Sequence, residues 1–263
     1  MKKELIISYE DDASKIALIE DGRLFELHEI KQNTDFVVGD IFVGKIKKLA
    51  PNLNAAFVNI GYEKDAFLHY QDLGPQYLTY RKFLQDTVSK RQQTSSLKNF
   101  QIQPEIDKHG TVDKVMAAQD EVLLQITKEP ISTKGPRLSA DLSIAGRYIV
   151  LVPFSNVISI SKKIKSNTER NRLKKIIESI KPKNFGVIIR TVSEGKGVAE
   201  LQKDLLDSVS KWESFAKKLP DAEPSKRVWG EMDRTSTLIR DILSTDFTNV
   251  YVSDAGLFED IRS

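Results

Sequence analysis

Cysteine is absent from the 263 residues of this chain, and histidine occurs only three times. Without cysteine, the chain has no disulfides, no thiolate zinc sites and no cysteine nucleophile. The histidines, His28, His69 and His109, are too scattered to show the spacing of metal ligands. Phosphate-binding glycine loops and the HExxH pattern of zinc proteases are missing as well.

Long apolar runs are also lacking. The longest, at residues 148–154, is far too short to cross a bilayer. The first twelve residues contain only a three-residue apolar run before charges return, so we expect no signal peptide. These features predict a cytoplasmic protein without a membrane span.

Charge is abundant but nearly balanced, with 40 Lys and Arg against 37 Asp and Glu and a net charge of +3. The distribution is less even, because residues 162–190 hold ten basic side chains and only two acids, Glu169 and Glu178. Such a stretch is a candidate phosphate-facing surface. A solvated helix face would show the same composition, so both interpretations remain open here.

The most informative stretch, residues 38–73, predicts three short strands separated by glycines and a Pro51-Asn52 turn. It places Phe57 and Phe67 on neighbouring strands, ten residues apart, with several lysines close by. Small barrels of this kind bind single-stranded nucleic acid by stacking bases on exposed aromatic rings beside a positive groove. The alternative is that both rings belong to the core, since aromatic residues favour half-buried sheet positions.

The length of the chain suits two domains or a few subdomains. An antiparallel meander is predicted over residues 3–30, and a closing barrel strand over 121–127. The polar stretch 76–112 predicts a long mobile loop or a partly helical insertion. The predicted elements after Gly135 are strands at 148–154, 185–191, 227–229 and 249–252, and helices at 166–180, 198–219 and 236–243. Ser166 and Glu169 have the spacing of a capping box at the start of the first of these helices.

Several runs, taken in order, carry a family resemblance. They are ELIIS at 4–8, PNLNAAFVNIG at 51–61, KGPRLSADLSIAGRYIVLVP at 134–153, GVIIRT at 186–191, KDLLDSVSKWE at 203–213 and TNVYVSD at 248–254. In order and spacing they resemble the N-terminal half of the ribonuclease E/G family of bacterial endoribonucleases. The resemblance covers almost the whole chain apart from the polar insertion.

This resemblance implies a mixed α+β fold of several subdomains. Residues 1–35 and 224–263 would together form a ribonuclease-H-like α/β subdomain. Residues 36–129 would form a five-stranded S1-type OB-fold β-barrel inserted into it, with the long insertion at 76–112. Residues 130–223 would form an α/β "5′ sensor" that reads a monophosphate at the end of the RNA.

The resemblance also implies the site residues. Phe57 and Phe67 match RNA-stacking aromatics, Lys134 matches a basic RNA contact, Gly146 and Val150 would offer backbone approach to the terminal phosphate, and Arg190 and Thr191 would hold it. This chemistry is reasonable, because a guanidinium grips phosphate oxygens through two hydrogen bonds and a hydroxyl adds another. The chain departs from the family pattern at Ala66, where glycine is commoner, and at Pro136 and Arg137, where small residues are usual.

By this resemblance the chain is the single-stranded RNA-binding and 5′-monophosphate-sensing portion of an endoribonuclease of RNA processing and decay. We expect it to stop before the catalytic subdomain, in which aspartates hold Mg²⁺ and a cysteine motif forms a zinc link between subunits. We therefore expect no catalytic residue, metal ligand or cofactor in this chain. Mg²⁺, structural zinc and oligomer formation are expected only for the full-length parent, and this portion is expected to be a monomer.

Two other functions remain open at this point. The first is a stand-alone RNA-binding adaptor without nuclease activity. The second is a metal-dependent nuclease acting through the ribonuclease-H-like unit, a chemistry that requires several carboxylates converging on metal ions. The first predicted strand offers only Glu4 and the last is followed only by Asp254, fewer carboxylates than this chemistry requires. We therefore expect no metal site there.

Overall fold

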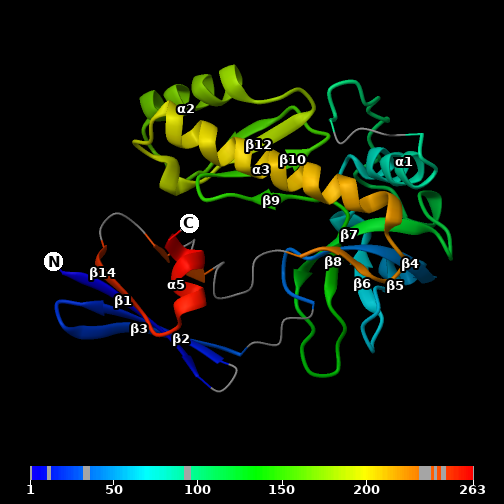
Figure 1. The fold of residues 1–263 in the computed structure, drawn as a ribbon. Helices are drawn as coiled ribbons and strands as arrows, with labels where there is room; N and C mark the ends of the chain where they lie inside the picture. Colours follow the sequence, from blue (N-terminus) through cyan, green and yellow to red (C-terminus); the bar gives the residue numbers. More distant parts are fainter. Residues whose placement is uncertain are drawn as a thin grey trace. The chain divides into compact units, whose positions relative to one another are not determined.

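The computed structural model describes residues 2–10, 13–31, 36–91, 96–230, 238–239, 242–243 and 247–262. Its contacts divide the chain into two compact units (Figure 1). One unit combines residues 1–37 with 232–263, and the other spans 38–231. We describe each unit by itself.

The discontinuous unit is built on a four-stranded sheet. Its elements are β1 (Lys3–Glu10), β2 (Ala13–Glu20), β3 (Arg23–Lys31), β14 (Phe247–Val252) and helix α5 (Ala255–Arg262). The strand order is β14-β1-β2-β3, with β14 parallel to β1 and the other pairs antiparallel. Asp21 and Gly22 both have positive φ, at 47° and 77°, as a tight two-residue hairpin requires. The predicted meander is confirmed.

The core of this unit lies on one face of the sheet. Leu5, Ile7 and Ile16 alternate along β1 and β2 with exposed or half-buried residues, and they pack with Ile239. The terminal strand predicted at 249–252 is confirmed as part of β14. The helix predicted at 236–243 falls largely outside the described residues, and the ribonuclease-H-like assignment stays a prediction.

The second unit begins with a closed five-stranded barrel. Its strands are β4 (Ile41–Ala50), β5 (Ala55–Asn59), β6 (Ala66–His69), β7 (Glu121–Lys128) and β8 (Arg137–Ser139). They follow the order β4-β5-β6-β8-β7, and pairing of β4 with β7 closes the ring. Within the barrel, β6 and β8 pair in parallel and the other neighbouring strands are antiparallel. This arrangement fits the OB-type barrel that the sequence predicted.

Two predicted boundaries need correction. The barrel was expected to end by residue 129 with its closing strand at 121–127, but β8 lies beyond both and completes the ring. β8 has only three residues, too few to show an alternating pattern. Residues from 224 onward were expected to join the N-terminal unit, but β13 (Arg227–Trp229) pairs with β4. The Ser225 N–H also donates to the Val43 carbonyl at 2.7 Å.

The insertion at 76–112 contains a packed helix, α1 (Tyr77–Val88). Its buried side chains include Tyr80 and Phe83, whose rings lie 4.9 Å and 5.2 Å from the ring of Phe154. The partly helical alternative is therefore confirmed for these residues, and the mobile-loop alternative is wrong for them. The buried residues of α1, among them Tyr77, Tyr80 and Leu84, recur every three to four positions, a spacing that the polar composition of the whole stretch conceals.

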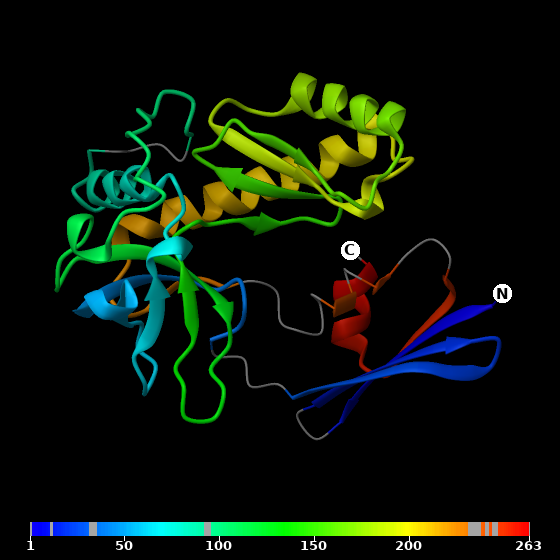
Figure 2. The same cartoon turned by 180° about the vertical axis from the view of Figure 1, so that it is seen from behind.

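The rest of the unit is a second four-stranded sheet with two helices. It consists of β9 (Ile144–Ala145), β10 (Ile149–Pro153), β11 (Ile158–Ile160), β12 (Phe185–Ile189), α2 (Asn167–Ile180) and α3 (Val198–Lys218). The strand order is β11-β12-β10-β9. Both views show α3 running along one face of this sheet (Figures 1 and 2). The Ser166 hydroxyl accepts the Glu169 N–H at 3.3 Å, which confirms the Ser166 half of the predicted capping box, whereas the Glu169 carboxylate binds Arg172 and the Gly195 N–H.

One hydrophobic core joins the barrel to this second sheet. It includes Ile41 and Val43 of β4, Phe83 of α1, Leu151 of β10 and Trp212 of α3. The barrel and the α/β region therefore share one compact unit, although the sequence suggested a boundary near residue 130. In the described part of the chain, no helix is both long enough and apolar enough to cross a bilayer.

Candidate nucleic-acid interface

Phe57 of β5 and Phe67 of β6 are directly opposite each other in the antiparallel ladder. Their ring centroids lie 5.9 Å apart, with the ring planes inclined at 70°. Both side chains are half-buried, whereas the neighbouring Val58 and Leu68 are fully buried. Neither ring belongs to the core, because the alternation of the strands directs these two positions to the outer surface.

The same row continues across all five strands of the barrel. Lys48 of β4 pairs with Phe57, Phe67 pairs with Arg137 of β8, and Arg137 pairs with Lys128 of β7. Directly paired residues share one face of a sheet. Lys48, Phe57, Phe67, Arg137 and Lys128 therefore form one continuous line, here named the cross-barrel row. The ammonium of Lys48 lies 4.9 Å from the centre of the Phe57 ring.

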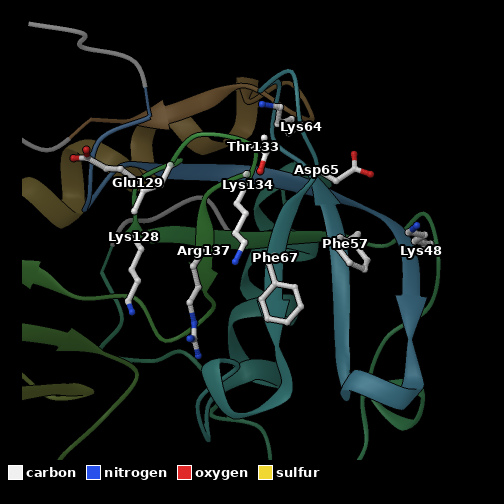
Figure 3. Close-up of a pocket in the computed structure, with 12 residues that line it drawn as sticks. Lys48, Phe57, Lys64, Asp65, Phe67, Lys128, Glu129, Thr133, Lys134 and Arg137 are labelled. Carbon is white, nitrogen blue, oxygen red and sulfur yellow. The ribbon is translucent and has the colours of Figure 1, made fainter.

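A groove of about 710 Å³ lies along the cross-barrel row (Figure 3). Besides the row itself, it is lined by Lys64, Asp65, Glu129, Ile131, Thr133, Lys134 and Gly135. The lining thus contains five basic and two acidic side chains. In Figure 3 the side chains of Phe67, Lys134, Arg137 and Lys128 extend in the same direction. Aromatic faces beside a surplus of positive charge are what single-stranded nucleic acid requires.

Lys134 reaches this groove from the loop between β7 and β8. A Cβ atom on Gly135 would collide with the Asp65 carbonyl, so glycine allows the loop to lie against the start of β6. The Phe67 N–H donates to the Pro136 carbonyl at 2.9 Å and fixes the loop there. The structure therefore brings Phe57, Phe67 and Lys134 together, as their predicted common role requires.

The four residues predicted to bind a terminal phosphate lie around the second sheet. Arg190 follows β12, and its Nη1 donates to the Gly146 carbonyl at 2.9 Å. Val150, on β10, pairs with Ile188 of β12. The Thr191 hydroxyl lies 2.8 Å from the hydroxyl of Ser161. Gly146 and Arg190 are thus in direct contact, and Thr191 faces the segment that follows β11.

Asp204 of α3 holds the β9–β10 hairpin in place. Its carboxylate accepts the backbone N–H groups of Arg147, Tyr148 and Ile149, each at 2.9 Å. A Cβ atom on Gly146 would lie only 2.6 Å from Asp204 Oδ2. The Gly146 N–H itself donates to the Ile149 carbonyl at 2.8 Å. The glycine is therefore required by the close carboxylate within the protein.

Sequence reasoning missed Asp204. It lies within the run KDLLDSVSKWE, where an acid on a helix looks like an ordinary solvated position. Its three backbone partners are more than fifty residues away in the chain, so no local pattern connects them. The only available signal was Gly146, which marks a close backbone approach without showing to what.

Part of the basic stretch at 162–190 has a structural role. Arg170 Nη1 donates to the carbonyls of Ser161 and Ile164 at 2.8 Å and 3.2 Å. Arg172 binds the Glu169 carboxylate through Nε and Nη2 at 2.7 Å and 2.6 Å. Arg172, together with the Gly195 N–H, lowers the pKa of Glu169 to about 2. These two arginines fix loops of the protein, which reduces the charge available for a phosphate.

Comparison with known proteins identifies the family. A model of the Ribonuclease E/G family matches residues 143–263. Ribonuclease G of Escherichia coli is 28% identical over 259 residues, which are 98% of this chain and 49% of the relative. Ribonuclease E of a Nostoc species is 30% identical over 259 residues, which are 98% of this chain and 33% of the relative. The chain belongs to the ribonuclease E/G family. It spans about half the length of the ribonuclease G relatives that it matches.

The acids that the structure describes in this ribonuclease E/G family member do not gather into a cluster. Among them, no group of three or more His, Asp or Glu side chains converges on a point that could hold a metal ion. The Glu4 carboxylate binds the Lys2 ammonium at 2.9 Å, the Asn249 amide at 3.0 Å and the Tyr251 hydroxyl at 3.1 Å. Those contacts account for the lowered pKa of Glu4, with the Asn249 hydrogen bond as the largest cause.

Proposed function

We propose that this chain binds single-stranded RNA along the cross-barrel row, as the RNA-recognition portion of a ribonuclease E/G-type endoribonuclease of RNA processing and decay. The observation that carries the proposal is the direct pairing of Phe57 with Phe67 between cationic side chains. Bases stack on such rings whatever their identity, while lysines contact the phosphates that join them. RNA is favoured over DNA because the relatives are named ribonucleases.

The test is fluorescence anisotropy with a labelled ten-nucleotide single-stranded RNA of mixed sequence. Phe57→Ala and Phe67→Ala should each weaken binding about fivefold or more, because each stacked base contributes about 1–3 kcal/mol. Phe25→Ala serves as a matched control, since Phe25 is 67% exposed on β3 and is not part of the groove. Equal affinity of all three variants and the wild type would refute the proposal.

The second part of the proposal concerns the 5′ end of the RNA. We infer that Arg190 and Thr191 bind a terminal monophosphate beside the β9–β10 hairpin. Support comes from the Arg190–Gly146 contact, which orients the guanidinium, and from the Thr191 hydroxyl next to it in the chain. A planar guanidinium suits a phosphate, because it binds phosphate oxygens through paired hydrogen bonds.

This part has its own experiment. The same RNA, carrying a 5′-monophosphate or a 5′-hydroxyl, is compared on the wild type and on Arg190→Ala. Tighter binding of the monophosphate to the wild type, lost in the variant, is the expected result. Arg91→Ala, which removes an exposed arginine after α1, controls for net charge. No preference for the monophosphate in the wild type would contradict the assignment.

We propose that this chain binds RNA without cleaving it and that cleavage belongs to the full-length parent. The motivation is the absence of a carboxylate cluster from the described part of the chain. RNA incubated with this chain and Mg²⁺ should therefore remain intact on a denaturing gel. Cleavage that stops on chelation of Mg²⁺, and also in Glu4→Gln, would instead support an intrinsic nuclease. If RNA binds without cleavage even in the full-length protein, the alternative of an RNA-binding adaptor is favoured.

A further inference from the structure

We infer that Arg137 forms a third base-stacking position beside Phe67, so that the cross-barrel row takes three successive unpaired nucleotides of an RNA. This inference rests on the proposed function, because it extends the same groove by one subsite. Arg137 occupies the position of the cross-barrel row next to Phe67, on the neighbouring strand β8.

The first observation is the orientation of the Arg137 guanidinium. Nε donates to Oδ2 of Asp72 at 2.9 Å, and Nη2 forms an ion pair with the same oxygen at 2.8 Å. Because two nitrogens of one edge lie against the same carboxylate oxygen, the direction of the planar guanidinium is restrained. Asp72 is itself held in place, because its carbonyl accepts the Ser139 hydroxyl at 2.8 Å and the Ala140 N–H at 2.9 Å.

The second observation is that this oriented side chain borders the groove. The Arg137 side chain retains 42% of its accessible surface although one edge of its guanidinium faces Asp72. In Figure 3 it extends next to Phe67 and Lys134. Guanidinium planes stack on bases much as aromatic rings do. The fixed plane, together with the pairing to Phe67, suits Arg137 to receive the base after the one on Phe67.

The charge around Arg137 favours stacking over a phosphate contact. The Asp72 carboxylate binds Arg137 directly and would repel a phosphate placed on the same edge. Lys128 and Lys134, both lining the same groove, provide separate positive charges for the phosphates. Neighbouring strands are about 4.8 Å apart, so Phe57, Phe67 and Arg137 provide one platform per strand at regular intervals. The expected ligand is thus a run of three unpaired nucleotides.

The experiment separates stacking from charge with two substitutions. Arg137→Ala removes the plane and the charge, whereas Arg137→Lys keeps the charge and removes the plane. Both should weaken binding of the ten-nucleotide RNA about fivefold or more, and Arg137→Lys should leave the salt dependence unchanged. The inference is overturned if Arg137→Lys binds like the wild type while Arg137→Ala flattens the log–log salt slope by about 0.7, as loss of a phosphate contact would.

A length series provides a readout that does not depend on the overall stability of a variant. Unlabelled oligouridylates of two, three and four nucleotides compete with the labelled RNA. The wild type should gain affinity between two and three nucleotides, and Arg137→Lys should lose that gain. An identical length dependence in both proteins would overturn the inference. Arg91→Ala is the matched control, because Arg91 is an exposed arginine outside the groove lining.

The result also distinguishes this inference from the proposed function. If Phe57→Ala and Phe67→Ala weaken binding while both Arg137 variants bind like the wild type, only the third position is wrong. If the phenylalanine variants also bind normally, the groove itself is not the RNA site. Asp72→Asn should reproduce part of the Arg137→Lys effect, because it weakens the bonds that fix the guanidinium plane.

Discussion

Asp204 and Gly146 meet so closely that a side chain on the glycine would lie 2.6 Å from a carboxylate oxygen. The same carboxylate receives three consecutive backbone N–H groups of the β9–β10 hairpin. The Gly146 carbonyl in turn accepts a hydrogen bond from the Arg190 guanidinium. The position of the proposed phosphate-binding arginine is therefore linked, through one hairpin, to an acid on α3.

Gly146→Ala should lower the free energy of unfolding by about 1–3 kcal/mol, because the added methyl forces the hairpin away from Asp204. Chemical denaturation measures this change. Gly230→Ala is the matched control, since Gly230 is exposed and its Cβ would meet nothing closer than 3.4 Å. Equal destabilisation by both substitutions would contradict the close-contact explanation.

The Asp204 clamp can be tested by a double-mutant cycle. Asp204→Ala leaves three backbone N–H groups without their acceptor and should destabilise the unit by about 1.5–3 kcal/mol. The double variant with Gly146→Ala should be more stable than the sum of the two losses predicts, because the methyl then fills the vacated space. Strict additivity of the two free-energy changes would show that the residues act independently.

Lys48→Gln should weaken the salt dependence of RNA binding. Lys48 lies at one end of the cross-barrel row with its ammonium over the Phe57 ring, where it can contact the phosphate next to a stacked base. Losing one phosphate contact on a single strand changes the log–log slope by about 0.7. Anisotropy titrations at several salt concentrations measure this slope. Lys217→Gln, at an exposed position near the end of α3, should leave it unchanged.

The Glu169–Arg172 pair makes stability depend on pH in the acid range. The pKa of Glu169 is lowered to about 2, first by the Arg172 hydrogen bonds and then by the Gly195 N–H. A carboxyl with a lowered pKa stabilises the fold above its ordinary value of about 4.3 and loses this effect as pH falls toward 2.

Because ionised Glu169 stabilises the fold and protonated Glu169 does not, the effect of Glu169→Gln on stability should depend on pH. At pH 7 the substitution should lower the free energy of unfolding by about 1 kcal/mol, because the pair is partly exposed to solvent. Near pH 2, where Glu169 is about half protonated, most of this difference should be lost. Glu178→Gln is the control, since its partner Lys174 lies 3.8 Å away and both side chains are half exposed. A difference between variant and wild type that is the same at both pH values would contradict the assignment.

Strands β1, β2, β5 and β6 could be predicted because buried residues along them alternate with more exposed ones. Phe57 and Phe67 could be singled out for the same reason, as large rings on strands otherwise filled with small or aliphatic residues. Helix α2 was marked by its Ser166 cap. In each case the signal is local in the chain, so it survives without knowledge of the fold.

The features that the sequence did not predict depend on contacts between segments that are far apart in the chain. Arg137 looked like a departure from a family pattern until the parallel pairing of β8 with β6 placed it beside Phe67. Asp204 likewise meets its partners only when α3 packs on the second sheet. The predicted domain boundary near residue 130 does not divide the structure into two units, because buried side chains from the barrel, α1 and α3 form one core. No sequence pattern within a single segment indicates such contacts.

Ultraviolet cross-linking of a single-stranded RNA to this chain, followed by peptide mass spectrometry, tests the central claim most directly. We predict cross-links on the strands that carry Phe57 and Phe67, and on the segment from Lys128 to Arg137 that borders the same groove. These cross-links should disappear when both phenylalanines are replaced by alanine. Cross-links confined to other surfaces of the chain, and unchanged in the double variant, would show that the cross-barrel row is not the RNA site.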